Sequence, residues 1–427
     1  MAERIEPIDL LRRAFGDAVA AAHPGAALRG RLPAAPRGRL VVVGAGKAAA
    51  VMAAAVEAAY PAEVDVRGLV VTRRGQGALG SGRIEVAEAS HPLPDEAAAA
   101  TTERMLALVD AAGADDHVLV LVSGGGSALL GAPAGLSLAG LRQVADALLR
   151  SGADVREMNV VRRRLGKAAG GRLAARAWPA PVTALVVSDV VGDDPADVAS
   201  GPTTPDPTHD ADAVRVLDRY AIDAPEARAR LAAGAVDPAP PADDPRWRTV
   251  RTEIVASARA ALDAAAARLR AAGWPTFVLA DDVEGEASAA GAWHAAVVRN
   301  LLAGRGAVAP PCALVSGGET TVTVRGNGRG GRNTEFALGL ALGLPDGAPV
   351  WALVADSDGI DGRGDHAGAL LMPSVWQRWD RGRARAALAC NDSAGFLDDV
   401  GSLLVTGPTG TNVNDVRLVL VGRPSAG

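Results

Sequence analysis

Short apolar runs that end in glycine-rich turns alternate with alanine-rich stretches of helical periodicity along the first half of the chain. The runs read LVVV, VRGLVVT, VLVLV and TALVVS, at residues 40–43, 66–72, 118–122 and 183–188. Strands of a parallel sheet are buried on both faces and therefore read as continuous apolar runs. The pattern predicts an α/β domain built on a parallel sheet.

The second half repeats this pattern, and its predicted strands lie at 276–280, 312–315, 320–324, 351–355, 403–406 and 417–421. One of them, TTVTV at 320–324, alternates as an antiparallel strand does, which favours a mixed second sheet. The segment 232–250 is rich in proline and aspartate and is typical of a linker. A helical pattern begins at Thr252, and another helical pattern lies within residues 1–22. We therefore predict two domains, 1–245 and 246–427.

The composition favours an ordinary globular protein that acts on small molecules. Hydrophobic residues make up 49% of the 427 positions and charged residues 22%, and the net charge is -5. No basic block marks a nucleic-acid or membrane surface. Only Cys312 and Cys390 are present, which fits a reducing compartment, and no apolar stretch approaches the ~20 residues that span a bilayer. We expect a cytoplasmic protein with neither nucleic-acid nor membrane partners.

Ligands of open α/β sheets bind beyond the carboxyl ends of the strands, so the segments after the apolar runs are the candidate sites. The first is Gly44-Ala45-Gly46-Lys47. It would place an ammonium group and free backbone amides at the start of a helix, where anions bind. A plain strand-to-helix turn also favours glycine, so this reading stays open.

The segment after the third run gives a stronger indication of phosphate binding. It reads Ser123-Gly124-Gly125-Gly126-Ser127. Three glycines remove every side chain that could keep a phosphate from the backbone amides. Glycine in a helix costs about 1 kcal/mol of stability relative to alanine, and close approach of a phosphate explains why three glycines are tolerated here.

Aspartates gather after two other predicted strands. Asp189 and Asp193 follow the fourth run, and Asp358 and Asp361 follow the predicted strand 351–355. Magnesium prefers oxygen ligands and keeps several waters while it bridges to phosphates, so one or two of these acids would suffice to bind it. Turn and helix capping is the alternative role for about half of them.

Arg332 stands where a helix of the second domain is predicted to begin. Its guanidinium could pair with two oxygens of a carboxylate or phosphate and stabilise charge on a transferring phosphoryl group. A surface salt bridge is the alternative. Polar candidates for substrate or nucleotide binding follow neighbouring strands of this domain, namely Glu319, Asn333, Thr409 and Asn412.

Taken in order, several long segments resemble the glycerate 2-kinase family, which is also called class II glycerate kinase. They read GAGKAA, HPLPDE, SGGGSALL, SDVVGDD with ASGPTT, GGETTVTVRGNGRGGRNTE, DSDGIDG and TGPTGTNVND, and they cover most of the chain. Each segment alone is ambiguous. Their number and order are specific, and GGRNTE and TGPTGTNVND are the most distinctive.

The resemblance implies ATP-dependent phosphorylation of D-glycerate at its 2-hydroxyl with Mg²⁺, giving 2-phosphoglycerate and ADP. It implies an α/β fold of two Rossmann-like α/β/α lobes with an active-site cleft between them, the C-terminal lobe having the mixed sheet. Lys47 and Arg332 would be the catalytic cations. Phosphoryl transfer needs mainly positioning and charge neutralisation, which two cations and a metal can supply. Glycerate and ATP are then the partners, and a homodimer stays open.

Two segments depart from the family pattern. Residues 159–171 read NVVRRRLGKAAGG, where the family tends towards N-x-V-R-K-H-L-S-x-x-K-G-G. The lysine missing at Ala169 could be replaced by Lys167 or by the neighbouring arginines, although a helix sets positions 167 and 169 about 200° apart. In the other segment Asp356 and Ser357 precede Asp358, where the family more often reads G-T-D-G.

Two other functions stay open at this point. A hydroxypyruvate reductase using NAD(P)H would suit the GAG after the first strand, but the third glycine of a dinucleotide fingerprint is absent. Arg73 and Arg74 stand where an acid is expected, although they could accept a 2′-phosphate. A catalytically inactive ligand-binding homologue is the second alternative. His91 is a candidate base or substrate contact, with a structural role between prolines as the alternative.

Overall fold

The computed structural model describes residues 6–77, 82–190, 192–234, 238–362 and 364–422. Its contacts divide the chain into two compact units: Pro24–Val255, here called the N-terminal unit, and Met1–His23 with Ala256–Gly427, called the C-terminal unit. This division differs from the predicted one in two ways. The boundary lies after Val255 and not after residue 245, and the first 23 residues belong with the C-terminal unit. The first helix, α1 (Pro7–Ala22), belongs with the C-terminal unit because it packs on α11 (Ala258–Ala271).

The N-terminal unit is built on a six-stranded sheet in the order β3-β2-β1-β4-β5-β6. The strands are β1 (Leu40–Ala45), β2 (Val66–Arg73), β3 (Ile84–Ala89), β4 (His117–Ser123), β5 (Val182–Val187) and β6 (Val250–Ala256). Strands β1 to β5 pair in parallel. The predicted parallel sheet is confirmed.

Two strands of this sheet were not predicted. The sequence of β3, IEVAEA, carries two glutamates because this strand lies at the edge of the sheet and is only partly buried. The residues of β6 were predicted as the start of a helix from Thr252. That boundary is wrong, since the helix α11 begins only after Ser257, whose side chain accepts a hydrogen bond from the Ala260 amide.

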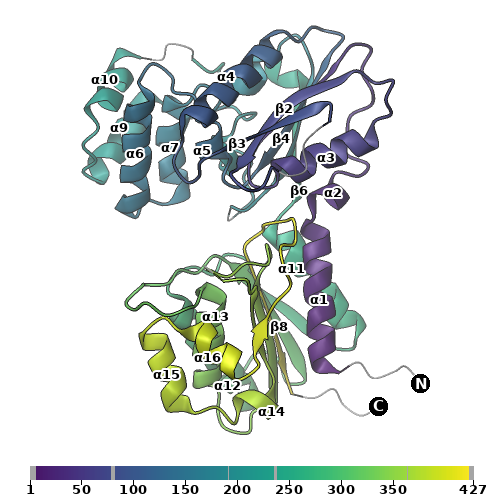
Figure 1. Cartoon of the computed structure of the whole chain (residues 1–427), viewed down its shortest axis with the longest axis vertical. Coiled ribbons are helices and arrows are strands. Elements are labelled where there is room, and N and C mark those ends of the chain that lie inside the picture. The colour runs from purple at the N-terminus through teal and green to yellow at the C-terminus, as the bar shows by residue number, and fades with distance from the viewer. Residues whose placement is uncertain (1–5, 78–81, 191, 235–237, 363, 423–427) are drawn as a thin grey trace. The chain divides into compact units, whose positions relative to one another are not determined.

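Helices cover this sheet, and a further group of helices lies beside it (Figure 1). α4 packs over the face of the sheet that carries Val41, Val43 and Val120, together with α8, while α6, α7, α9 and α10 bury a second, separate apolar cluster. The helices are α2 (Pro24–Ala27), α3 (Ala49–Ala59), α4 (Glu96–Asp110), α5 (Gly126–Leu129), α6 (Leu138–Ser151), α7 (Val155–Leu165), α8 (Arg172–Arg176), α9 (Asp210–Arg219) and α10 (Pro225–Ala233).

Gly44 lies in β1 where this strand passes close to β4. A β-carbon at Gly44 would lie 2.2 Å from the Leu121 carbonyl oxygen. We therefore expect Gly44→Ala to push the two central strands apart and to lower the free energy of unfolding by about 2 kcal/mol, as measured by urea unfolding. Gly113→Ala is the control, because nothing lies within 4 Å of the added carbon. An equal loss in both variants would contradict this explanation.

The C-terminal unit contains a second six-stranded sheet in the order β11-β10-β9-β12-β8-β7. The strands are β7 (Thr276–Ala280), β8 (Cys312–Gly318), β9 (Val350–Asp356), β10 (Gly368–Leu371), β11 (Leu403–Leu404) and β12 (Asp415–Val421). β7 and β8 are parallel, and the other neighbours are antiparallel. The predicted mixed sheet is confirmed.

The strand predicted at 320–324 is wrong. Only Thr321 forms an isolated bridge, to Glu286, and Val324 is 77% exposed. The place beside β8 that an antiparallel strand could fill is taken by β12. The alternating threonine and valine residues at 320–324 therefore form no strand, because no neighbouring strand is available to pair with them.

Helices lie on both faces of the second sheet. α1 and α11 pack together on one face, while α12 (Ala287–Leu302) and α13 (Arg332–Gly343) pack together on the other with α15 (Arg381–Ala389) and α16 (Ser393–Asp399). A short helix, α14 (Pro373–Trp376), completes this unit. Among the described residues, no helix is long and apolar enough to cross a membrane.

Candidate functional site

The turn after β1 is held to the turn after β4 by backbone hydrogen bonds. The Lys47 amide donates to the Gly124 carbonyl (2.9 Å), and the Ala48 amide donates to Ser123 Oγ (3.0 Å). The Gly46 amide donates to the Val71 carbonyl (3.1 Å). The expectation that the amides of this turn are free to bind an anion is therefore wrong.

Gly44, Gly46 and Ser123 thus have a packing role in the structure. A β-carbon at Gly46 would lie 2.1 Å from Ser123 Oγ, just as one at Gly44 would meet the neighbouring strand. Glycine at Gly46 is also required by its φ of 140°. These contacts place the Lys47 side chain beside the second glycine-rich turn, where its Cγ would lie 3.5 Å from a β-carbon added to Gly125.

The glycine-rich turn after β4 keeps its backbone accessible. In the described part of the chain, no backbone carbonyl accepts a hydrogen bond from the amides of Gly124 or Gly125. A β-carbon at Gly124 would lie 1.8 Å from Asp189 Oδ2, and one at Gly125 would lie 3.0 Å from His91 Nε2. Gly124 and Gly125 therefore bring an acid, an imidazole and Lys47 around one stretch of free amides, followed by Gly126 and Ser127 in α5.

The electrostatic balance at this turn is positive. Burial, together with the charges of Lys47, Arg73 and Arg162, lowers the pKa of His91 to about 4, so this imidazole is neutral at pH 7. Within the described residues, neither a hydrogen bond nor an ion pair engages the Lys47 ammonium. An unpaired cation beside free amides is an arrangement that binds phosphate or carboxylate.

A strained segment contributes hydroxyl groups next to this turn. Ala199 and Ser200 have φ values of 51° and 60°, a left-handed conformation that costs roughly 1–2 kcal/mol per residue. Ser200 Oγ lies 2.8 Å from Ser127 Oγ and donates to Asn159 Oδ1 (2.9 Å). Strain of this kind is concentrated at functional sites, so the ASGPTT segment belongs with the candidate site.

The predicted metal ligands of this unit are not assembled into a ready cluster. Asp189 lies against Gly124, whereas Asp193 is half-buried in a turn with a φ of 51°. Across the described ranges, no group of three or more His, Cys, Asp or Glu side chains is arranged to hold a metal ion. Metal binding by Asp189 and Asp193 stays a prediction.

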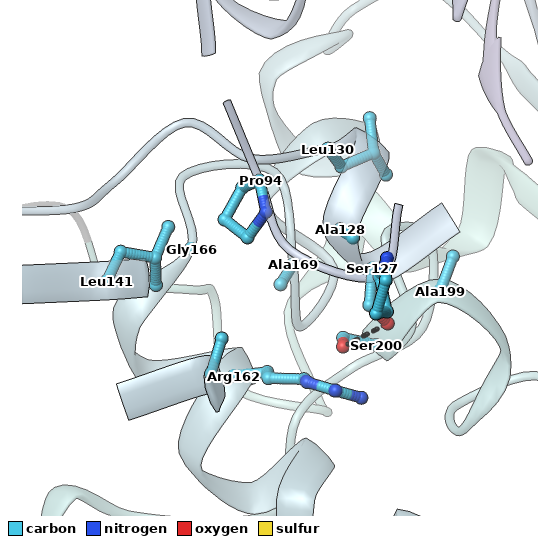
Figure 2. Close-up of a pocket in the computed structure, with 12 residues that line it drawn as sticks. Pro94, Ser127, Ala128, Leu130, Leu141, Arg162, Gly166, Ala169, Ala199 and Ser200 are labelled. Atoms are coloured by element: carbon cyan, nitrogen blue, oxygen red, sulfur yellow. Dashed lines mark hydrogen bonds between the residues drawn. The ribbon is translucent and has the colours of Figure 1, made fainter. Parts of the chain in front are cut away.

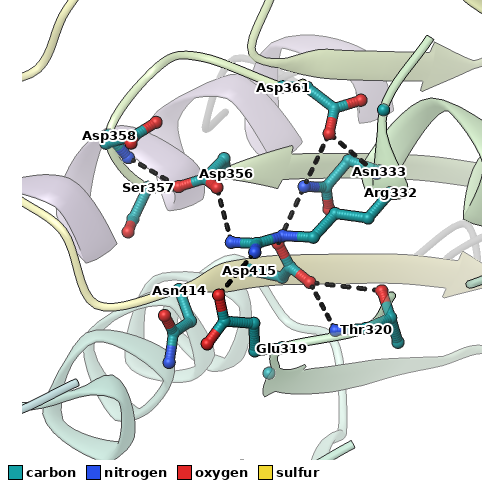
Figure 3. A network of polar contacts seen from close by, with 12 residues as sticks. Glu319, Thr320, Arg332, Asn333, Asp356, Ser357, Asp358, Asp361, Asn414 and Asp415 are labelled. Carbon is teal, nitrogen blue, oxygen red and sulfur yellow. Dashed lines mark hydrogen bonds and ion pairs between the residues drawn. The ribbon is translucent and has the colours of Figure 1, made fainter. Parts of the chain in front are cut away.

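In the C-terminal unit, Arg332 is the centre of an ion-pair network (Figure 3). Its Nε donates to Asp415 Oδ1 (2.7 Å), its Nη1 to Glu319 Oε1 (2.7 Å) and its Nη2 to Asp356 Oδ2 (2.6 Å). Asp415 is fully buried and also accepts from Arg417 Nη2 (2.5 Å). The surface salt bridge considered for Arg332 is thus replaced by a mostly buried network.

The charges in this network shift one another's protonation. Burial opposes the charge of Arg332, but the carboxylates of Asp415, Asp356 and Glu319 outweigh it and raise the pKa of the guanidinium. Burial raises the pKa of Asp356 well above its ordinary value, although Arg332 acts in the opposite direction. Arg332 is therefore the side chain that most favours the charged form of Asp356.

Other residues predicted for this site have structural contacts. Asp361 Oδ1 accepts from the Asn333 amide (3.0 Å) and Oδ2 accepts from the Thr334 amide (2.9 Å), which caps α13. Asn333 is fully buried and donates to Asp415 Oδ1 (2.8 Å). These contacts favour structural roles for Asp361 over metal binding and for Asn333 over ligand binding.

The remaining predicted residues lie in two adjoining loops. Thr409 donates through Oγ1 to the Ser357 carbonyl (2.5 Å) and through its amide to the Asp358 carbonyl (3.0 Å). Asn412 accepts a hydrogen bond from the Asn414 amide (3.1 Å). The half-buried Asp358 uses Oδ1 to accept from the Ile360 amide (2.8 Å). Asp358 is thus brought beside the Thr409 loop, and ligand or metal binding by these residues stays a prediction.

Family models and known proteins match most of the chain. Residues 10–232 match a domain of unknown function, DUF4147, and residues 312–415 match the MOFRL family. A protein of Agrobacterium vitis, provisionally named a hydroxypyruvate reductase, is 48% identical over 97% of this chain and 94% of its own length. A D-glycerate 2-kinase of Thermotoga maritima is 38% identical over 83% of this chain and 84% of its own length.

The fold is also shared with a solved structure. The crystal structure of a glycerate kinase from Thermotoga maritima has a TM-score of 0.86 and 35% sequence identity to this chain. The match covers 97% of this chain and 99% of the other one. Both sheets, including the mixed one, are therefore part of a known architecture.

Proposed function

Because this chain belongs to the glycerate 2-kinase family, we propose that it transfers the γ-phosphoryl group of ATP to the 2-hydroxyl of D-glycerate. The products are 2-phosphoglycerate and ADP. The named kinases among its relatives support a kinase, and the choice of donor, enantiomer and hydroxyl group is our proposal. A homodimer also stays a prediction.

The observation that carries this proposal is the Lys47 ammonium beside the amides of Gly124 and Gly125, none of which has a partner among the described residues. In phosphoryl transfer, negative charge spreads over the equatorial oxygens of the transferred group, and the protein contributes mainly positioning and charge stabilisation. Backbone amides and an ammonium without a partner among the described residues give up only water when they bind that group. The neutral His91 next to them can accept a hydrogen bond from a hydroxyl group of the substrate.

In the C-terminal unit we assign Arg332 to the stabilisation of negative charge on a bound anion. Two of its three carboxylate partners, Asp356 and Asp415, are buried, whereas Glu319 is 57% exposed. The bond to Glu319 is therefore the one that a phosphate oxygen would replace. The other two bonds keep the guanidinium fixed while this exchange occurs.

A magnesium ion fits the oxygen donors near these groups. In the N-terminal unit Asp189, beside Gly124, and in the C-terminal unit the half-buried Asp358 are each a candidate to hold such an ion, since magnesium takes one or two carboxylates and fills its other positions with water and phosphate oxygens. Bound there, it would neutralise phosphate charge. The residues of this chain would still position the substrate and the proton.

The test is a coupled assay that separates 2-phosphoglycerate from 3-phosphoglycerate. We expect ATP-dependent formation of 2-phosphoglycerate from D-glycerate, abolished by EDTA and restored by Mg²⁺. Enolase converts only the 2-isomer, so its signal without added phosphoglycerate mutase identifies the product. Exclusive formation of the 3-isomer, or no turnover with any nucleotide, would refute the proposal.

A hydroxypyruvate reductase is the second candidate, because the 48% identical relative has that name. The hydrogen bonds of the turn after β1 argue against it. In a dinucleotide-binding fold the amides at the start of the first helix bind the pyrophosphate, but here the Lys47 and Ala48 amides already have partners. Oxidation of NADPH or NADH by the protein with hydroxypyruvate, in the absence of ATP, would favour the reductase.

A further inference from the structure

A small cavity opens directly beside the glycine-rich turn of the N-terminal unit (Figure 2). Its volume is about 40 Å³, far below the roughly 300 Å³ at which pockets for drug-sized ligands begin. Its walls come from Pro92, Pro94, Ala128, Leu130, Leu141 and Ala169. Such a space admits one end of a small molecule and excludes a nucleoside.

The polar groups of this cavity are one guanidinium and two hydroxyls. Arg162 of α7 extends towards the hydrogen-bonded pair Ser127 and Ser200, as Figure 2 shows. Ser127 immediately follows Gly126 in the glycine-rich turn. The cavity is therefore continuous in sequence and space with the free amides of Gly124 and Gly125.

Arg162 differs from its charged neighbours in having no partner among the residues that the structure describes. Arg163 pairs with Asp197 (2.6 Å), Arg164 pairs with Asp210 (2.7 Å), and Lys167 pairs with Glu103 (2.5 Å). For Arg162, the described residues provide neither an ion-pair nor a hydrogen-bond partner. Burial lowers the pKa of its guanidinium, with no carboxylate to compensate.

We propose that Arg162 binds the carboxylate of the hydroxy-acid substrate inside this cavity. A guanidinium matches a carboxylate with two parallel hydrogen bonds, and the apolar walls exclude the water that would weaken them. The hydroxyls of Ser127 and Ser200 then face the carbon chain of the acid. The identity of the acid as glycerate rests on the proposed function. The expectation that the ligand is negatively charged rests on the cavity alone.

The departure at residue 169 gives this site its selectivity. Ala169 lines the same cavity as Arg162, so the lysine that the family pattern has here would add a second cation. Lys167 does not replace it, because its ammonium is bound to Glu103. With one cation only, the cavity should accept a monocarboxylate and reject a dicarboxylate such as tartronate, whose second charge would stay unpaired.

The first test replaces Arg162 by alanine. We expect the KM for D-glycerate to rise on the order of 100-fold, because a charge-assisted bidentate pair is lost, while the KM for ATP changes less than about twofold. Arg162→Lys keeps the positive charge but cannot form two parallel hydrogen bonds, so its KM for D-glycerate should lie between those of wild type and Arg162→Ala. Lys167→Ala is the matched control and should leave both constants unchanged. A KM for D-glycerate within threefold of wild type in folded Arg162→Ala would overturn the proposal.

A second pair of variants leaves Arg162 in place. Ala169→Asp adds a carboxylate to the cavity that competes for the guanidinium, whereas Ala169→Asn has nearly the same shape without the charge. We expect the folded Asp variant to bind D-glycerate at least tenfold more weakly than the folded Asn variant. Equal affinity in the two variants would contradict a carboxylate site at Arg162.

Direct binding separates this inference from the proposed function. Calorimetric titration of the nucleotide-free protein with D-glycerate, hydroxypyruvate and the neutral glyceramide measures charge recognition without turnover. We expect both acids to bind more tightly than glyceramide, and Arg162→Ala to remove that preference. If this holds while no kinase activity is found, the proposed function fails and the carboxylate site stands. If the acids bind wild type no better than glyceramide, the site is refuted even if the kinase is active.

Discussion

Lys47→Ala is expected to lower kcat by about 10²–10³-fold while nucleotide binding stays measurable. The Lys47 ammonium has no partner within the described residues and lies beside free amides, so its charge is available to the transferred phosphoryl group. Loss of one such electrostatic contact typically costs 10²–10³-fold in rate, and charge stabilisation is most of what phosphoryl transfer requires from a protein. Initial rates with saturating ATP and D-glycerate measure this effect.

The stability and the titration of Lys47→Ala provide its controls. An unpaired ammonium contributes no ion pair, so the free energy of unfolding should change by less than about 1 kcal/mol. The charge of Lys47 helps to lower the pKa of His91, so the pKa of His91, measured by NMR, should rise in the variant while burial keeps it below the ordinary value. A variant that keeps more than a tenth of wild-type kcat would exclude Lys47 as a catalytic cation.

In the first sheet, the sequence predicted the strands that contain a clear apolar run and missed the two that do not; in the second sheet it also missed β10, which is buried but only four residues long. β1, β4 and β5 read as apolar runs because helices cover the sheet, and β2 keeps the buried run LVV between Arg67 and Arg73, whereas charged side chains interrupt β3 and β6. The failure at 320–324 has a different origin. Alternation describes a residue's own tendency, while a strand also needs a neighbour, and β12 already occupies that position.

The residues of the candidate site that lie within one turn could be predicted from the sequence. Those that distant strands bring together could not. The three glycines after β4 are a local signal. Asp415 was not singled out, and Asp356 was noted only as a departure from the family pattern, because the sequence does not show that these two acids become neighbours. The register sets Asp415 opposite Asp356 and Gly318, which places two like charges side by side. Two carboxylates so close are unfavourable unless a cation lies between them, and that cation is Arg332.

Arg162 was hidden for a different reason. The segment RRRLGK is uniformly basic, and sequence alone cannot tell which of its cations is paired. Three acids that lie far from this segment in sequence, Asp197, Asp210 and Glu103, engage its other side chains. The functional signal is therefore the absence of a partner, which only the tertiary structure reveals.

Arg332→Ala is expected to lower the free energy of unfolding of the C-terminal unit by about 3–5 kcal/mol and to abolish turnover. The substitution leaves the buried carboxylates of Asp356 and Asp415 without their shared cation, and an uncompensated buried charge carries a penalty of this size. Arg417 still compensates Asp415, so Asp356 should be the more affected acid. Urea unfolding of the variant and of wild type measures the difference.

A second substitution shows whether the unpaired charge causes this loss. Asp356→Asn removes the charge and keeps the shape, so Arg332→Ala/Asp356→Asn should regain about 1–2 kcal/mol relative to Arg332→Ala. In wild type, the same Asp356→Asn substitution removes a partner of Arg332 and should destabilise. If the second substitution lowers stability equally in both backgrounds, the two residues are not coupled and the network explanation fails.

The pH dependence of Arg332→Ala gives an independent check. Burial already raises the pKa of Asp356, and Arg332 opposes that rise, so the pKa should rise further in the variant. A carboxyl group whose folded pKa exceeds its unfolded value favours folding below the unfolded pKa and loses that contribution as the pH rises through the folded pKa. The deficit of Arg332→Ala relative to wild type should therefore be larger at pH 8 than at pH 5. A deficit that is constant with pH would mean that the lost stability comes from packing of the Arg332 side chain and not from its charge.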